Sequence, residues 1–209
     1  MTENTTSGAE RVLELIAVLL LGITTVGTAW CGFEAARWSG ESGDLSRAAS
    51  VQHVEGARLF GLATQRITYD SMVVAKYAEA SQAHNTALQK FYRQYIIRPE
   101  FLPVLARWEA AVKAGNAAAG VFQDKAYLAG QFADYDKTVA SAEQSSRDSQ
   151  QASEYADSYV SKTILLAVAL FFAGVTSSFR YRPARVLLLI AATGAVAVAA
   201  AGLATLPIA

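Results

Sequence analysis

The chain has 209 residues, of which 53% are hydrophobic, and its 18 lysine and arginine residues are balanced by 18 aspartate and glutamate residues. Because the formal net charge is zero, we expect no nucleic-acid partner. Most of the hydrophobic residues lie in three blocks, 12–33, 163–179 and 186–206, each close to the ~20 residues that a helix needs to cross a lipid bilayer. The sequence therefore predicts an all-α membrane protein with three transmembrane helices.

The first apolar block begins near the N-terminus, where a cleaved signal peptide is the alternative interpretation. Its flank carries Glu10 and Glu14 and is not the basic segment that a signal peptide needs. Ser7 and Glu10 have the spacing of a capping box, which favours a helix that begins around Gly8. We therefore expect residues 1–39 to form an N-terminal tail and a retained first transmembrane helix.

The end of this block carries tryptophans and charged residues at helical spacing. Trp30 and Trp38 are typical of membrane-interface anchors, because their amphipathic rings prefer the level of the lipid headgroups. Glu34 lies three residues before Arg37, so an ion pair at the wet end of the helix is the simplest interpretation. This interpretation needs no function beyond an interface role.

A pore is the alternative interpretation of the same region. Thr24, Gly27, Cys31 and Glu34 share one helical stripe of small or polar residues, next to Arg37. In a symmetric oligomer, such a stripe could line a path that ends in a ring of carboxylates, as in cation channels. No ionisable residue lies deep within any of the three blocks, so proton-coupled transport is not expected.

A short motif in this stretch resembles a family signature. Residues 30–35 read WCGFEA, similar to the W-x-x-[YF]-[QE]-A signature of a family of uncharacterised bacterial small integral membrane proteins. That family pairs one N-terminal membrane helix and a helical extramembrane region with two closing membrane helices, and the order of elements agrees over most of this chain. The resemblance implies this architecture and a bacterial inner-membrane setting. It implies no activity, because the family has none established.

Residues 40–161 are predicted to form a long antiparallel helical hairpin, a coiled-coil-like stalk. Apolar residues at helical spacing predict a first leg from about 45 to 97, which ends there because Pro99 pushes the residue before it out of helical geometry. A short amphipathic helix around Trp108 follows, and Gly115-Asn116 are suited to end it in left-handed geometry.

The return leg carries a regular heptad pattern and continues into the second apolar block without a helix breaker. Its predicted contact positions are Leu128, Phe132, Tyr135, Val139, Ala142, Ser146, Ser149, Ser153, Ala156 and Val160. Both legs have more apolar surface than two helices can hide, so we expect a homo-oligomer in which copies of the chain cover it. An intramolecular three-helix bundle is the alternative.

The loop between the second and third blocks predicts the orientation. It holds Arg180, Arg182 and Arg185, and positive charge in a short loop marks the cytoplasmic side. Residues 162–209 then form a transmembrane hairpin with a cytoplasmic loop. The N-terminus is cytoplasmic and the 40–161 stalk is extracytoplasmic.

Patterns of catalytic or metal-binding residues are not found in the sequence. His53 and His84 lack a second ligand at helical spacing. Asp124, Asp134 and Asp136 form a loose acidic group, for which a solvated face is expected and a weak divalent-cation site is the alternative. We expect no enzyme activity, cofactor or bound metal.

The sequence therefore favours a structural or accessory membrane protein whose stalk presents a helical interaction surface. The partner is expected to be a second copy of the chain, or another membrane or envelope protein. The alternative function is a homo-oligomeric cation channel lined by the first transmembrane helix.

Overall fold

The computed structural model describes residues 8–115, 124–179 and 181–209. These residues are helical apart from short turns, and no strand occurs among them, so the all-α class is confirmed. They divide into two compact units. The first unit combines the chain up to residue 47 with the chain from residue 145 onward, and the second holds residues 48–144. The predicted boundaries near residues 39 and 161 refer to a bilayer surface and stay predictions.

The first unit is built from three helical segments. They belong to α1 (Gly8–Gln82), α4 (Lys125–Val175) and α5 (Arg182–Leu203). Two buried clusters join them, and their members are Ala17, Leu20, Ala173, Leu189 and Ala192 in one and Cys31, Ala35, Tyr159, Leu166 and Ala199 in the other. Small side chains let these helices approach closely: a Cβ added to Gly27 would lie 3.1 Å from Leu166 Cδ1.

The outer faces of these segments are apolar as well. Large exposed side chains include Leu15, Val26, Phe171, Leu187 and Ile190. By length and composition, α1, α4 and α5 each contain a stretch that could cross a membrane. An apolar exterior on a helix bundle is what a lipid solvent requires.

The second unit holds a compact helical head. The last part of α1 packs with the π-helical turn η1 (Tyr92–Ile96), the 3-10 turn η2 (Pro99–Phe101), α3 (Leu102–Lys113) and the start of α4. The short helix α2 (Thr86–Phe91) is joined to α1 by the hydrogen bond that Gln89 Nε2 donates to Ala80 O at 3.4 Å. Its core consists of Val73, Val74, Tyr77, Ile97, Phe101, Val104, Leu105 and Tyr127. The rings of Phe101 and Tyr127 meet edge-on at 5.2 Å, which joins η2 to α4.

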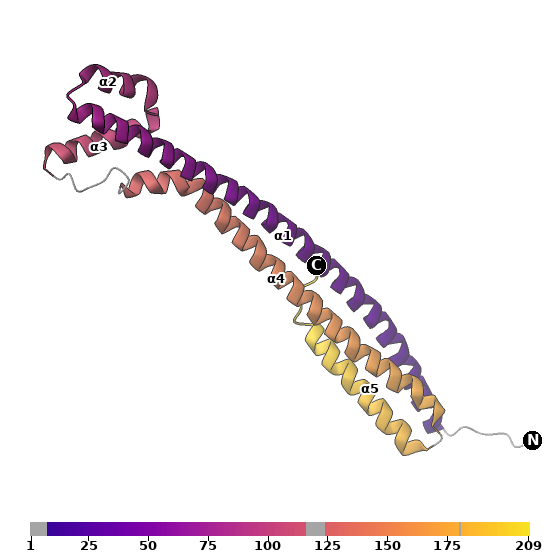
Figure 1. Ribbon diagram of the computed structural model, residues 1–209. Helices are drawn as coiled ribbons and strands as arrows, with labels where there is room; N and C mark the ends of the chain where they lie inside the picture. The colour runs from indigo at the N-terminus through magenta and orange to yellow at the C-terminus, as the bar shows by residue number, and fades with distance from the viewer. Residues whose placement is uncertain (1–7, 116–123, 180) are drawn as a thin grey trace, which may run out of the picture. The chain divides into compact units, whose positions relative to one another are not determined.

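The first leg of the predicted stalk is shorter than expected. We predicted one helix to about residue 97, but α1 ends at Gln82, and α2 and η1 follow as separate turns beside it (Figure 1). His84 adopts a left-handed φ of 55°, and Asn85 Oδ1 accepts a hydrogen bond from Leu88 N at 3.0 Å to start α2. Asparagine is a preferred N-cap residue, so a new helix begins here although the apolar periodicity of α1 continues.

Other predicted helix ends agree with the structure. Arg98 is extended before Pro99, and Gly115 has φ 82° after α3. The helix α1 begins at Gly8 and α4 runs without interruption from the second unit into the first. Ser7 of the predicted capping box and Asn116 of the predicted left-handed turn lie outside the described residues.

The predicted heptad seam on α4 is correct only in part. Ala142 and Ala156 are buried, and Ser149 Oγ donates to Ser42 O at 2.8 Å. Ser146, Ser153 and Val160 are exposed instead. From residue 145 onward, the positions that turn inward are Ser145, Ser149, Ala152, Ala156 and Tyr159, one residue out of phase with the predicted seam at three points.

Candidate interaction surface

A buried carboxylate organises the head. Asp70 on α1 is 2% exposed, and it receives Arg98 Nε at 3.0 Å on Oδ1 and Arg98 Nη2 at 2.5 Å on Oδ2. Tyr127 Oη of α4 donates to Asp70 Oδ2 at 2.6 Å. A bidentate arginine and a phenol together supply the donors that a buried carboxylate requires. This cluster ties α1, the turn before Pro99 and α4 to one another.

The electrostatics of this cluster favour fixed protonation. Burial, and then the hydrogen bond to Asp70, raise the pKa of Tyr127 well above its usual range. The same carboxylate raises the pKa of Arg98 through its hydrogen bond. Tyr127 therefore remains a proton donor and Arg98 remains a cation, which suits a structural clamp and not proton transfer.

A second polar cluster holds the other side of the head. Tyr77 Oη donates to Glu109 Oε1 at 2.5 Å, and Arg93 Nη1 donates to both Glu109 oxygens at 2.9 and 3.0 Å. Burial and the hydrogen bond to Glu109 raise the pKa of Tyr77. These contacts fix η1 against α1 and α3. The backbone that carries the neighbouring side chains of α2 and η1 is thereby held in place.

Asp124, the first residue of the acidic group predicted on the return leg, has a structural role. Asp124 accepts Arg107 Nε at 2.8 Å and caps α4 by accepting Tyr127 N at 3.0 Å. Both contacts lower the pKa of Asp124. Across the described ranges, no group of three or more His, Cys, Asp or Glu residues is placed to hold a metal ion.

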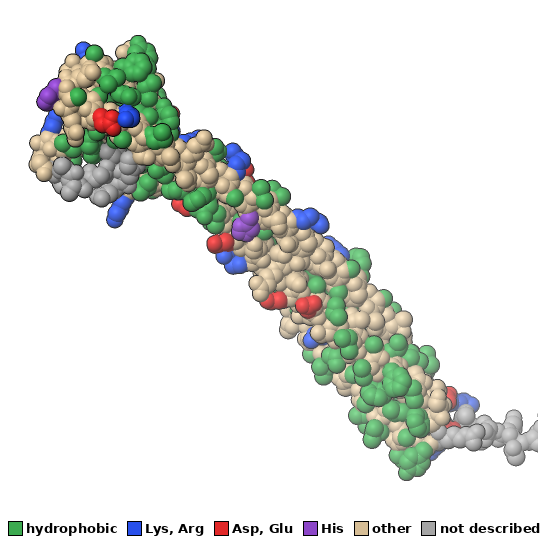
Figure 2. All heavy atoms as spheres, in the orientation of Figure 1, with side chains coloured by type: hydrophobic (Ala, Val, Ile, Leu, Met, Phe, Trp, Pro, Cys, Tyr) green, Lys and Arg blue, Asp and Glu red, His purple; other side chains and the backbone are tan. Residues whose placement is uncertain are grey.

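An exposed aromatic surface lies on the head. We define it by the side chains Tyr69, Met72, Leu88, Phe91 and Tyr95. Met72 and Tyr95 are each 68% exposed, and the Phe91 and Tyr95 rings lie 5.6 Å apart. Tyr69 Oη donates to Ile96 O at 2.8 Å, which joins the part of this surface on α1 to the part on η1. Figure 2 shows hydrophobic side chains gathered over this part of the head.

A shallow groove of about 540 Å³ continues the aromatic surface along α1. Its lining residues are Phe60, Gly61, Thr64, Gln65, Thr68, Tyr69 and Met72. None of these lining residues is charged. This surface was not predicted from the sequence, because α2 and η1 were predicted to continue α1 and not to fold back beside it.

The predicted pore stripe faces the interior of the chain itself. Thr24, Cys31 and Glu34 are fully buried within the first unit. Thr24 Oγ1 donates to Leu20 O at 2.6 Å within its own helix. Since α4 and α5 of the same chain cover this stripe, it is not available in this conformation to line a path between copies.

The predicted ion pair between Glu34 and Arg37 is absent. Glu34 Oε2 accepts Ala209 N at 2.9 Å, and Glu34 Oε1 has no hydrogen-bond partner in the described part of the chain. The Arg37 guanidinium is exposed and lies over the Phe33 ring, 5.8 Å from its centroid. The two charged side chains therefore leave α1 on different faces.

The two predicted interface tryptophans differ in environment. Trp30 is exposed beside Phe33, whereas the Trp38 ring lies tilted against the Tyr155 ring, with 4.8 Å between their centroids. Trp38 Nε1 donates to Pro207 O at 3.2 Å, and Tyr159 Oη donates to the same oxygen at 3.0 Å. Sequence reasoning missed these tyrosine and proline partners, because they come from segments far away in the chain.

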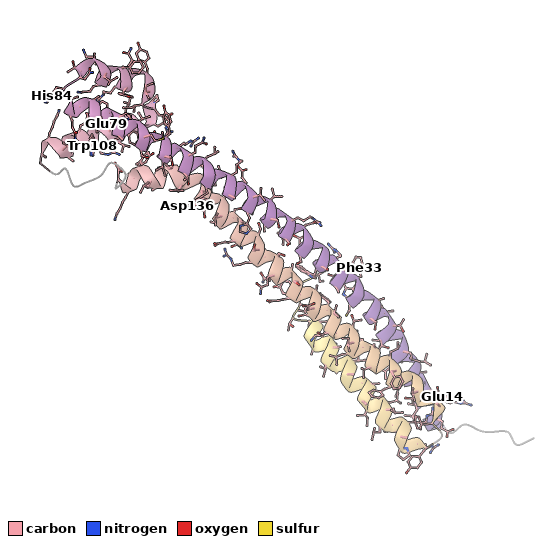
Figure 3. All side chains as sticks on the ribbon, in the orientation of Figure 1. Glu14, Phe33, Glu79, His84, Trp108 and Asp136 are labelled. Atoms are coloured by element: carbon pink, nitrogen blue, oxygen red, sulfur yellow. The ribbon has the colours of Figure 1, made fainter. Side chains whose placement is uncertain are left out.

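Two of the three arginines predicted in a loop, Arg182 and Arg185, lie in the first turn of α5 and meet the acidic start of α1. Arg182 Nη2 lies 3.4 Å from Glu10 Oε1, and Arg185 Nη2 lies 3.8 Å from Glu14 Oε1. Glu14, labelled in Figure 3, lies at the end of the bundle where α5 begins. Arg180 lies outside the described residues.

Comparison with known proteins gives no relative: no family model, no curated protein and no solved structure matches this chain. The resemblance of residues 30–35 to a family signature therefore stays a prediction.

Proposed function

We propose that this protein is a structural or accessory integral membrane protein whose helical head binds a second copy of the chain. The apolar segments of α1, α4 and α5 span the bilayer in this proposal, and the head lies outside the cytoplasm. The observation that carries the proposal is the aromatic surface. It gathers five large exposed apolar side chains on the head, which in this proposal lies outside the bilayer, so contact with lipid does not account for it.

The membrane part of the proposal rests on the exterior of the first unit. Its outward side chains are aliphatic and aromatic over three segments that are long enough to cross a bilayer. Arg182 and Arg185 at the start of α5 favour a cytoplasmic position even where they pair with Glu10 and Glu14, since the positive-inside rule counts arginine and lysine and not net charge. The resemblance to bacterial membrane proteins supports the same setting.

The aromatic surface has the composition of a protein interface. Tyrosine, phenylalanine and methionine are enriched where proteins meet, and charged residues are depleted there. The buried clusters around Asp70 and Glu109 hold the backbone beneath this surface, so little ordering is needed on binding.

Membrane anchoring favours a second copy as the partner. Every inserted copy presents the same surface on the same side of the bilayer, which raises the effective concentration of identical surfaces. A two-fold interface uses one patch twice and needs no other gene product. Thr24, Cys31 and Glu34 are buried within the chain, so their positions do not support the alternative of a channel lined by the first helix.

The test places a charge on the aromatic surface. Met72→Glu and Tyr95→Glu should each shift the full-length chain in detergent from oligomer to monomer, as measured by light scattering corrected for bound detergent. Both side chains are 68% exposed, so the fold should tolerate the change. Ala133→Glu, at an exposed position of α4 in the same unit, is the matched control and should leave the mass unchanged.

A wild-type chain that is monomeric at all concentrations would contradict self-association. An oligomer that survives both substitutions would place the interface elsewhere. A monomeric wild type that gains mass with an envelope protein, and loses it with Tyr95→Glu, would instead assign the surface to a different partner.

A further inference from the structure

A polar groove lies in the first unit, at the end of the apolar block of α1. It has a volume of about 450 Å³, and its lining residues are Ala36, Arg37, Trp38, Gly40, Glu41, Asp44, Ile208 and Ala209. We propose that this groove binds the headgroup of a phospholipid that carries a phosphate and a primary ammonium, such as phosphatidylethanolamine. The inference rests on the membrane insertion of α1 in the proposed function.

Arg37 is placed to meet the phosphate. Side chains on a helix lean toward its N-terminus, and the Arg37 guanidinium accordingly lies over the Phe33 ring, on the side of the apolar block. It is exposed and has no ion-pair partner among the described residues. A free guanidinium at the edge of a hydrocarbon layer is a strong donor for a phosphate oxygen.

The carboxylates of the groove follow one turn farther from the apolar block. Glu41 lies four residues beyond Arg37, a rise of about 6 Å along α1. It is exposed and has no ion-pair partner among the described residues, whereas Asp44 pairs with Arg47. In a zwitterionic lipid the phosphate is attached nearer the hydrocarbon and the ammonium lies farther out. The sequence of charges along the groove is therefore complementary to that of the headgroup.

The groove favours a primary ammonium over a trimethylated one. Glu41 offers carboxylate oxygens that accept N–H hydrogen bonds, which a trimethylammonium group cannot donate. Recognition of a trimethylated amine uses a cage of aromatic faces instead. Trp38 is the single aromatic residue in the lining, and its ring already packs against Tyr155.

The far wall of the groove is fixed by buried polar contacts. Pro207 O accepts hydrogen bonds from both Trp38 and Tyr159, and Ala209 N donates to the fully buried Glu34. This wall is thus held against α1 and α4 by three hydrogen bonds. The groove is therefore a built feature of the unit and does not require a ligand to form.

The test is native mass spectrometry of the full-length chain in detergent, titrated with phosphatidylethanolamine or phosphatidylcholine of identical acyl chains. The wild type should bind the ethanolamine lipid roughly threefold to tenfold more tightly, as expected for one charge-assisted hydrogen bond at a partly exposed site. Glu41→Gln should abolish this preference. Arg37→Gln should weaken the binding of both lipids.

Glu154→Gln is the matched control, because Glu154 is an exposed carboxylate of α4 next to Tyr155, at the level of Trp38 but outside the groove. It should leave the preference unchanged. Equal binding of the two lipids to the wild type, or a preference that survives Glu41→Gln, would overturn the headgroup site alone. Release of the chain from cell membranes by alkaline carbonate would overturn membrane insertion, and the headgroup site with it.

Discussion

At the scale of single residues, Asp70 is the side chain on which the head depends most. It lies on the apolar stripe of α1 between Ala63 and Val74. A buried carboxylate requires a cationic partner, so an aspartate within an apolar stripe predicts an ion pair. The sequence did not reveal which cation. Arg98 is close to Asp70 only because α1 ends at Gln82 and the chain folds back.

Replacing Asp70 by asparagine should destabilise the head. The change leaves the Arg98 charge without its partner, and we expect a loss of roughly 2–4 kcal/mol, below the full cost of breaking a buried pair because the Arg98 side chain is 24% exposed. Thermal unfolding followed by circular dichroism would measure it. Glu55→Gln breaks an exposed pair with Arg58 in the same unit and should leave the midpoint unchanged. Equal midpoints for Asp70→Asn and the wild type would refute the clamp.

Tyr127 should make stability sensitive to alkaline pH. Its pKa is raised in the folded chain, so the phenol stabilises the fold fully below the ordinary tyrosine pKa of about 10. Above that pH the unfolded chain ionises first, and stability falls as pH rises. Tyr127→Phe should be less stable than the wild type at pH 8 and should lose less stability between pH 9 and 11. Parallel pH profiles for the two chains would contradict this assignment.

At the scale of elements, periodicity predicted where helices lie better than which way they face. The short helix around Trp108, the uninterrupted α4 and the ends at Pro99 and Gly115 follow from local chemistry. The phase of the small-residue seam of α4 does not, because alanine and serine occupy neighbouring positions on this part of the helix and their side chains are similar in size. Their pattern therefore does not decide that Ala152 turns inward and Ser153 turns outward.

Two neighbouring substitutions on α4 test this phase. Ala152 is 2% exposed, so Ala152→Leu should overpack the contact with α1 and cost ~1–3 kcal/mol. Ser153→Leu adds a similar volume on the exposed side and should have little effect on the unfolding midpoint. The opposite order of stabilities would restore the heptad phase predicted from the sequence.

At the scale of the whole molecule, the sequence predicted the helical class and the three apolar segments. It also predicted a surplus of apolar surface on the stalk. It did not predict the aromatic surface, since Phe91 and Tyr95 join Tyr69 only after the turn at His84. The burial of Glu34 could not be predicted either, because its partner is the backbone of Ala209, 175 positions away.

The orientation of the chain is testable with single cysteines in a Cys31→Ala background. A cysteine at Ser178, in the arginine loop, should resist a membrane-impermeant thiol reagent in intact cells. A cysteine at Ala83, beside the turn at His84, should react. Both positions are exposed in the structure, so accessibility reports the bilayer and not the fold. The reverse labelling pattern would invert the proposed topology.

The most direct test of the central claim, that the aromatic surface joins two copies in the membrane, is disulfide cross-linking in native membranes. In the Cys31→Ala background, a cysteine at Tyr95 should give a covalent dimer on mild oxidation, because the proposed interface places Tyr95 close to the two-fold axis, where identical residues of the two copies approach each other. A cysteine at Ala133, equally exposed but away from the surface, should stay monomeric. Dimer yields that do not differ between the two positions, or no dimer at either, would contradict the account.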